Sequence, residues 1–256
     1  MELNKIYNED CLETMKRMPN NFIDLTLTSP PYDNLRDYKG YFFDFENIAK
    51  ELFRITKEGG LLVWVVGDSV INGSESGTSF KQALFFKEIG FNLHDTMIYR
   101  KTNYIPLTHN RYEQAFEYMF VFSKGKPNVF NPIMVECKSA GQKTDKRTFY
   151  QDTNGYTSAG HNNSEVKKTK QKENVWDLST NAGTIGHPAQ FPEKLVEDHI
   201  LSWSNEEDIV YDPFMGSGTT GKMAQMLKRK WIGSEISKEY VDIAEARIKS
   251  ISNTLF

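Results

Sequence analysis

The sequence has few of the features that mark an exported, membrane or disulfide-rich protein. Its 256 residues include only two cysteines, Cys11 and Cys137, which are far apart and form no CxxC pair. We therefore expect neither a disulfide framework nor a cysteine metal site. The longest apolar run, residues 61–66, is much too short to cross a bilayer. The first residues, MELNKIYNEDC, lack the apolar core of a signal peptide. These absences predict a cytoplasmic protein with no membrane partner and no metal.

An overall excess of positive charge is also missing, because the net charge is −3. The charge is unevenly distributed, however. Residues 124–173 contain nine lysines and one arginine against five acidic residues, a net charge of +5 that leaves −8 for the rest of the chain. Taken alone, such a segment is more often a solvated loop than a surface that faces phosphates, and the charge leaves both interpretations open.

Strand-like and helix-like patterns alternate on both sides of this basic segment. Apolar runs typical of strands lie at residues 23–29, 59–68, 95–100, 118–124, 209–214 and 231–236. Helical spacing of apolar residues is found at residues 45–57, 80–91, 192–203, 219–230 and 237–251. Alternation of this kind predicts an α/β fold, with a mainly parallel sheet and helices on both of its faces.

Residues 124–186 interrupt this alternation. They are rich in Gly, Asn, Thr, Ser and Lys, with only scattered aromatic residues. A run of this length without a pattern is usually either functional or disordered, so we interpret it as an insert. The sequence then divides into residues 1–123, the insert 124–186 and residues 187–256, and the first and last parts form one domain.

The stretch YDPFMGSGTTGK, residues 211–222, is the strongest sign of a cofactor. Gly216, Gly218 and Gly221 satisfy the pattern GxGxxG between a strand and a helix, where glycines permit a tight turn and close approach of a ligand to the helix N-terminus. Glu235 ends the next strand, where a carboxylate accepts hydrogen bonds from ribose hydroxyls. The pattern predicts an adenosine-containing cofactor without naming it. The alternative is a tight turn followed by a surface acid at Glu235.

Four motifs in a fixed order carry a resemblance to a known family. TSPPY (28–32), HPAQFPEKL (187–195), DPFMGSGTTG (212–221) and WIGSEISKEYVDIAEARI (231–248) together resemble the β group of S-adenosylmethionine-dependent DNA amino-methyltransferases. In that group the catalytic motif precedes the target-recognition insert, and the cofactor loop comes last. The resemblance covers nearly the whole chain except the insert. It implies a Rossmann-like methyltransferase fold with a circularly permuted motif order, an inserted target-recognition region, and a place in the prokaryotic cytosol or nucleoid.

The resemblance also implies S-adenosylmethionine as the cofactor and indicates which residues bind it. Glu235 would hold the ribose hydroxyls, and Thr219 or Thr220 would bind the carboxylate at the helix start. Asp10 falls where the family places an acid near the adenine; the alternative is that it caps the helix that follows. The implied cofactor-binding set is Asp10, Thr28, His187, Pro188, Phe191, Asp212, Pro213, Phe214, Gly216, Ser217, Gly218, Thr219, Thr220 and Glu235.

Two residue types that are often catalytic have no chemical role in this interpretation. His187 belongs to the motif that closes over the amino-acid end of the cofactor in the family, and we assign it no acid–base function. Cys11 and Cys137 lie in EDCLE and ECKSA, and neither has the surroundings of an activated thiolate. Methylation of an exocyclic amine needs no covalent nucleophile, in contrast to methylation of cytosine carbon 5.

The catalytic residues implied by the resemblance are Ser29, Pro30, Pro31 and Tyr32. An exocyclic amine is a poor nucleophile, because its lone pair is delocalised into the ring. The Ser29 hydroxyl and the Pro30 carbonyl could accept hydrogen bonds from its two N–H groups and leave the lone pair free to attack the methyl group. Two prolines stiffen the backbone that presents this carbonyl. Tyr32 offers a face on which a flipped-out base can stack.

Contacts to DNA are predicted less specifically. Arg36 suits a phosphate contact, and Tyr99 and Tyr104 are candidates for the second wall of the base pocket, with core packing as the alternative. Lysines and Arg147 in the insert would supply phosphate affinity and base contacts. The predicted DNA-binding set is Arg36, Tyr99, Tyr104, Lys143, Lys146 and Arg147.

The residue before Pro-Pro indicates the target base. Within the family, Ser or Thr at this position favours cytosine N4 and Asp favours adenine N6, so Ser29 predicts a cytosine-N4 methyltransferase, with adenine N6 as the alternative. Two other classes remain open: an NAD(P)-dependent oxidoreductase that uses the glycine loop, and a DNA-binding module that has lost catalysis. The expected partners are double-stranded DNA, a cognate restriction endonuclease and a second copy of the chain.

Overall fold

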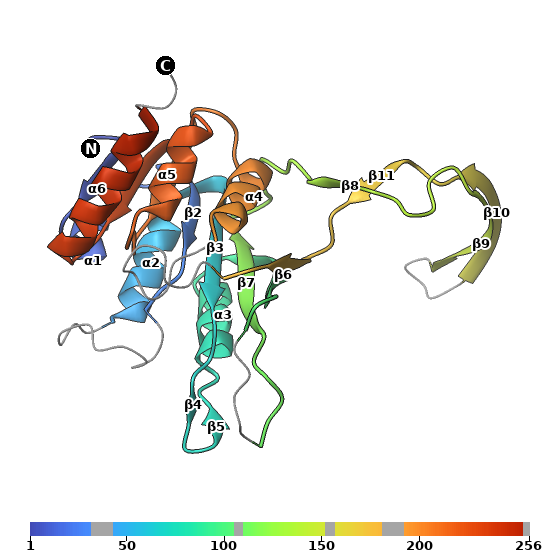
Figure 1. The fold of residues 1–256 in the computed structure, drawn as a ribbon, viewed down its shortest axis with the longest axis horizontal. Helices are drawn as coiled ribbons and strands as arrows, with labels where there is room; N and C mark the ends of the chain where they lie inside the picture. Colours follow the sequence, from blue (N-terminus) through green and yellow to red (C-terminus); the bar gives the residue numbers. More distant parts are fainter. Residues whose placement is uncertain (32–42, 105–109, 152–156, 181–191, 253–256) are drawn as a thin grey trace. The chain divides into compact units, whose positions relative to one another are not determined.

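The computed structural model describes residues 1–31, 43–104, 110–151, 157–180 and 192–252 (Figure 1). The chain divides into two compact units. The first contains Met1–Asn131 and Asn174–Phe256, and the second contains Pro132–Glu173.

A mixed sheet forms the centre of the first unit. Eight strands of the described residues follow the order β1-β14-β13-β2-β3-β7-β6-β12. Their bounds are β1 (Lys5–Tyr7), β2 (Ile23–Thr28), β3 (Thr56–Val66), β6 (Asn92–Lys101), β7 (Phe116–Ser123), β12 (Val175–Leu178), β13 (Ile209–Asp212) and β14 (Lys230–Ser234). Only β7 runs antiparallel to its two neighbours, and the other described pairs are parallel. The prediction of a mainly parallel sheet is confirmed.

Helices cover both faces of this sheet, as predicted (Figure 1). Their bounds are α1 (Cys11–Lys16), α2 (Phe45–Ile55), α3 (Thr78–Glu88), α4 (Glu193–Trp203), α5 (Thr219–Met226) and α6 (Lys238–Ser252). The first three share a core with the sheet in which Trp64 of β3 packs edge-on against Phe86 of α3. Among the described residues, no helix is both long and apolar enough to span a membrane.

Three strands of the first unit that sequence patterns did not predict, β1, β4 (Val70–Ile71) and β5 (Ser74–Glu75), are short. β1 has only three residues, too few for a period to be recognised, and it pairs with β14 at the edge of the sheet. The strands β4 and β5 form a hairpin around Asn72 and Gly73, which have φ values of 50° and 79°. An Asn-Gly pair in this conformation is a hairpin signal, so the turn is encoded in the sequence.

The second unit, Pro132–Glu173, contains fewer residues than the predicted insert of residues 124–186. It contains the paired strands β8 (Met134–Glu136) and β11 (Thr169–Gln171), and the pair β9 (Lys143–Gln151) and β10 (Thr157–Glu165). On its N-terminal side, the Asn131 N–H donates to the Ser202 carbonyl, 2.9 Å away in the first unit. On its C-terminal side, β12 joins the main sheet beside β6. The segment predicted as an insert, residues 124–186, therefore contains strands, and its two ends belong to the first unit.

Candidate functional site

The predicted cofactor and catalytic motifs meet at one edge of the sheet. β13 ends at Asp212, its neighbour β2 ends at Thr28, and β14, on the other side of β13, ends at Ser234. These three strands are parallel, so their carboxyl ends share an edge. β13 and β2 are neighbours although they are far apart in sequence, so the order of the strands in the sheet departs from their order in the chain at this point. Ligands of open α/β sheets bind at the carboxyl ends of the strands where the strand order changes.

Asp212 connects the glycine loop to the strand that precedes Ser29. Its Oδ1 accepts hydrogen bonds from the Thr28 hydroxyl at 2.6 Å and from the Phe214 N–H at 3.0 Å. Its Oδ2 accepts one from the Thr220 hydroxyl at 2.6 Å. Burial raises the pKa of Asp212 to about 6, although the hydrogen bonds from Thr220, Thr28 and Phe214 act in the opposite direction. The carboxylate is thus bonded to the protein itself, as a bridge between β2, β13 and α5.

The glycines of the loop serve the packing of α5 against α6 as well as the turn. Gly218 has a φ of 83°, and a Cβ added to it would lie 2.7 Å from the Cβ of Ala244 in α6. A Cβ on Gly221 would lie 3.0 Å from Cδ1 of Ile248. Gly216 also has a positive φ, of 51°. The GxGxxG pattern therefore has a structural cause in this chain, in addition to the ligand approach that the sequence suggests.

The start of α5 presents main-chain donors. Gly218 is the N-cap residue, and no side chain caps the helix. The Thr220 hydroxyl is bonded to Asp212, and the Thr219 hydroxyl accepts a hydrogen bond from Arg247 at 3.3 Å. Because the first N–H groups of a helix have no partner within the helix and lie at its positive end, this position suits an anion such as a carboxylate.

Glu235 lies across the loop from α5, just after β14. Its Oε2 accepts a hydrogen bond from the Gly216 N–H at 2.9 Å, and its Oε1 accepts one from the Ser237 N–H at 2.8 Å. Burial raises its pKa. The Asn8 side-chain amide donates to the Glu235 carbonyl at 2.8 Å and so connects the end of β1 to this segment. The half-buried carboxylate is therefore held against the glycine loop.

The first three residues of the predicted catalytic motif continue β2 at the same edge. Thr28 pairs with Trp64 of β3, Ser29 and Pro31 are half-buried, and Pro30 is buried. Five further predicted site residues lie outside the described residues; they are Tyr32, Arg36, His187, Pro188 and Phe191.

The predicted DNA-binding residues other than Arg36 are divided between the two units. Tyr99 in β6 is 3% exposed, and burial followed by the charge of Glu117 raises its pKa, an environment typical of core packing. Tyr104, after the same strand, is 45% exposed. Lys143 is exposed at the start of β9 in the second unit. Lys146 and Arg147 lie on that strand as well.

Asp10 and Cys11 occupy a well-defined local structure. The Asp10 carboxylate accepts a hydrogen bond from the Leu12 N–H at 2.7 Å, as the N-cap of α1. Helix capping, the alternative to an adenine contact, is therefore present. Cys11 is buried, and burial raises the pKa of its thiol, which agrees with the expectation that it is not an activated nucleophile.

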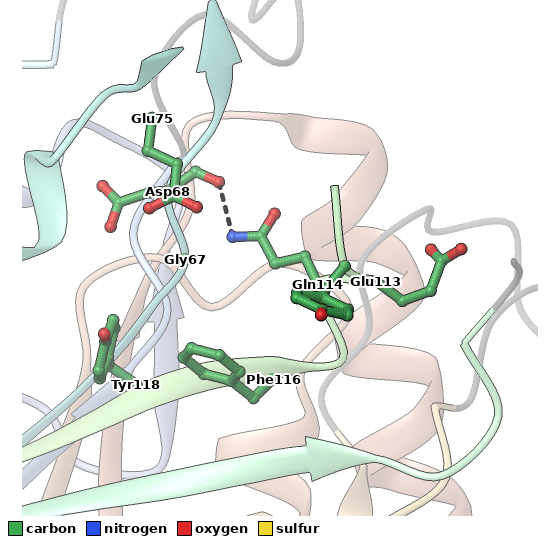
Figure 2. A pocket seen from close by; sticks show the side chains of 8 residues that line it. Gly67, Asp68, Glu75, Glu113, Gln114, Phe116 and Tyr118 are labelled. Atoms are coloured by element: carbon green, nitrogen blue, oxygen red, sulfur yellow. Dashed lines mark hydrogen bonds between the residues drawn. The ribbon is translucent and has the colours of Figure 1, made fainter. Parts of the chain in front are cut away.

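A cavity of about 200 Å³ beyond the end of β3 was not predicted (Figure 2). Its walls include Phe116 and Tyr118 of β7, and the Gln114 amide reaches the Asp68 carbonyl at 3.2 Å. The Asp68 carboxylate accepts a hydrogen bond from the Ser79 N–H at 3.0 Å and so binds the start of α3. The Asp68 carboxylate therefore has a structural role. An acidic residue directly after a buried strand was the only sign in the sequence of a polar site at this position.

Comparison with known proteins adds independent findings. Residues 23–246 match a family described as DNA methylase, N6_N4_Mtase. The chain is 54% identical over 237 residues to the orphan methyltransferase M.BamHII of Bacillus amyloliquefaciens, a match that covers 89% of each chain. It is 30% identical over 282 residues to the type II methyltransferase M.HinfI of Haemophilus influenzae, covering 97% of this chain and 69% of that protein.

Two solved structures have a similar fold. The PvuII DNA methyltransferase, described as cytosine-N4-specific, superposes with a TM-score of 0.70 at 22% identity, covering 97% of this chain and 90% of that one. The complex of M1.HpyAVI with S-adenosylmethionine superposes with a TM-score of 0.64 at 25% identity, covering 95% of this chain and 98% of that one. The expected methyltransferase fold is confirmed.

Proposed function

The chain belongs to the N6_N4_Mtase family of DNA methylases, and from that premise we propose that it transfers a methyl group from S-adenosylmethionine to N4 of a cytosine in double-stranded DNA. The observation that carries this proposal is the bridge from Thr28 through Asp212 to Thr220, with 2.6 Å hydrogen bonds on both sides. It connects the residue before Ser29 directly to the cofactor loop.

The loop between β13 and α5, together with Glu235, suits S-adenosylmethionine. When bound, the cofactor supplies an activated methyl group on a sulfonium leaving group. The uncapped start of α5 would bind its carboxylate through N–H groups, because the Thr219 and Thr220 hydroxyls already have partners in Arg247 and Asp212. The Glu235 carboxylate would accept hydrogen bonds from the ribose hydroxyls.

Ser29 and Pro30 would act on the target amine. The Ser29 hydroxyl and the Pro30 carbonyl would accept hydrogen bonds from its two N–H groups, which favours a pyramidal nitrogen whose lone pair is directed at the methyl group. The protein contributes mainly orientation, because the bond that breaks belongs to the cofactor. Tyr32 would stack on the flipped base.

The choice of cytosine rests on Ser29. In the family that the motifs resemble, Ser or Thr before Pro-Pro favours cytosine N4, whereas Asp favours adenine N6. The geometry that activates the amine is nearly the same for both bases, so the residue type at this position carries the assignment.

Residues 132–173 are the proposed target-recognition region. They contain seven lysines and one arginine against five acids. The side chains of Lys138, Lys143, Lys167, Lys168 and Lys170 are exposed, and that of Lys172 is half-buried. Such side chains neutralise phosphates, and the resulting affinity falls as salt rises. The relatives named as type II and orphan methyltransferases support a role in restriction-modification, either beside a partner endonuclease or as a solitary enzyme.

The proposal is tested by incubating the purified protein with methyl-labelled S-adenosylmethionine and duplex DNA, then digesting the DNA to nucleosides. We expect label in N4-methylcytosine and at least a 100-fold lower rate for Ser29→Ala. Label only in N6-methyladenine would overturn the base assignment. Titration calorimetry with S-adenosylmethionine and NADH separates the methyltransferase from an oxidoreductase, and unchanged methylation by Ser29→Ala would contradict the catalytic role.

A further inference from the structure

Arg247 of α6 contacts the cofactor loop, a role that the sequence alone did not indicate, although this arginine lies within the motif at residues 231–248. Its Nη1 donates to the Ser217 carbonyl at 2.5 Å, to the Ser217 hydroxyl at 2.9 Å and to the Thr219 hydroxyl at 3.3 Å. The side chain is only 11% exposed. A single guanidinium therefore contacts two residues of the predicted cofactor-binding set.

The other side of the same guanidinium contacts α4. The Arg247 Nη2 lies 3.1 Å from Oε1 of Glu193, the first residue of α4, and Nζ of Lys222 in α5 lies 2.6 Å from the same oxygen. Three helices are therefore connected through one carboxylate oxygen. Glu193 directly follows Pro192, the N-cap residue of α4.

We propose that Arg247 is a positioning residue for S-adenosylmethionine, which holds Ser217 and Thr219 in their binding conformation and couples the loop to the start of α4. Its planar guanidinium can donate to the loop and to Glu193 simultaneously, an arrangement that a lysine ammonium cannot reproduce. This inference rests on the proposed function, because it requires the loop to be the cofactor site.

Arg229 provides a matched control. It is also a buried arginine, and it donates to the Ser204 carbonyl at 2.7 Å and to the Leu227 carbonyl at 2.7 Å. It precedes β14, so it lies at the amino edge of the sheet, opposite the cofactor loop. Loss of its hydrogen bonds would lower stability without touching Ser217 or Thr219.

The test measures the Kd for S-adenosylmethionine by titration calorimetry, the KM for cofactor and for DNA, and the thermal midpoint. Arg247→Gln should raise the cofactor Kd and KM about tenfold, equivalent to about 1.4 kcal/mol, with the KM for DNA changed less than twofold. Arg247→Lys should show an intermediate rise. Arg229→Gln should lower the thermal midpoint and leave the cofactor Kd within twofold of the wild type.

Glu193→Gln tests the coupling to α4. It should raise the cofactor Kd two- to threefold in the wild type and have no further effect in Arg247→Gln, because the partner guanidinium is absent there. If Arg247→Gln does not fold, Ser217→Ala, which removes one of the contacted oxygens, should raise the cofactor Kd about threefold.

The inference is overturned if the Arg247 variants bind the cofactor like the wild type, or if Arg229→Gln weakens binding equally. Failure of the proposed function has a different signature. In that case the folded wild type itself would not bind S-adenosylmethionine, and both proposals would fall together.

Discussion

The loop between β13 and α5 and the unit formed by residues 132–173 differ in how far their side chains are buried. In the loop, Asp212, Met215, Ser217, Thr219 and Thr220 are all buried. In the unit, none of the side chains that the structure describes is buried. The side chains of the cofactor loop are thus part of the core. The described side chains of the proposed recognition region are in contact with solvent.

This difference has a functional consequence. Transfer of a methyl group requires that donor and acceptor are held in a narrow range of geometries, which a hydrogen-bonded core region provides. Recognition of a DNA sequence by exposed side chains can change without loss of stability, because surface substitutions usually alter stability by less than about 0.5 kcal/mol. The free energy of unfolding provides one scale on which the two regions can be compared.

The largest effect is expected for Asp212→Ala. It removes the acceptor of the Thr28 and Thr220 hydroxyls and of the Phe214 N–H, and leaves three donors in a buried site. At about 1–3 kcal/mol for each unsatisfied group, the loss should be about 4 kcal/mol or more. Urea unfolding followed by circular dichroism measures it. A loss below about 1 kcal/mol would mean that the bridge does not stabilise the fold.

The pH dependence of stability should reveal the same carboxyl group. Its pKa in the folded protein, about 6, lies above the usual value of 3.8, so the folded state holds the proton more tightly. The stabilisation is complete below about pH 4 and is lost as the pH rises through 6. Relative to Asp212→Asn, the wild type should lose on the order of 3 kcal/mol between pH 4 and pH 7. Parallel stability curves for the two proteins would contradict this assignment.

An intermediate effect is expected for Gly218→Ala, with Gly73→Ala as the control. Both glycines have a positive φ, but a Cβ on Gly218 meets Ala244, whereas a Cβ on Gly73 has no atom within 4 Å. The control should lose about 1 kcal/mol from backbone strain alone, and Gly218→Ala about 2 kcal/mol or more. Equal losses would show that the α5–α6 contact does not require glycine.

The smallest change in stability is expected in the unit formed by residues 132–173. Lys167→Gln combined with Lys168→Gln replaces two exposed side chains and should alter the free energy of unfolding by less than about 0.5 kcal/mol. The same variant should weaken DNA binding and reduce the slope of log affinity against log salt by about 2. Fluorescence anisotropy at several salt concentrations measures the slope. An unchanged slope would remove these lysines from the DNA interface.

Sequence patterns predicted the strands and helices around the site because those elements are long or strongly periodic. β3, a buried apolar run, and α4, which starts after Pro192, are examples. The family resemblance also placed Thr28 and the glycine loop in one cofactor-binding set. Patterns did not reveal β12, since a four-residue strand inside a segment rich in polar residues has no recognisable period.

The contacts within the site could not be predicted from the sequence for a different reason. Nothing in a linear motif shows that Asp212 bonds Thr28 across a separation of 184 residues, or that Arg247 contacts Ser217. Such contacts depend on which strands become neighbours and on how α6 packs against α5. The sequence identified the residue types at the site, and the packing of the elements determines which of them bond to each other.

The most direct test of the central claim is to map modified bases in the DNA of a host that has no methylation of its own and expresses this chain. The account predicts N4-methylcytosine at one short recurring sequence, and none in cells that express the Ser29→Ala protein at an equal level. Methylation confined to adenine, or modification that persists in the Ser29→Ala cells, would contradict it.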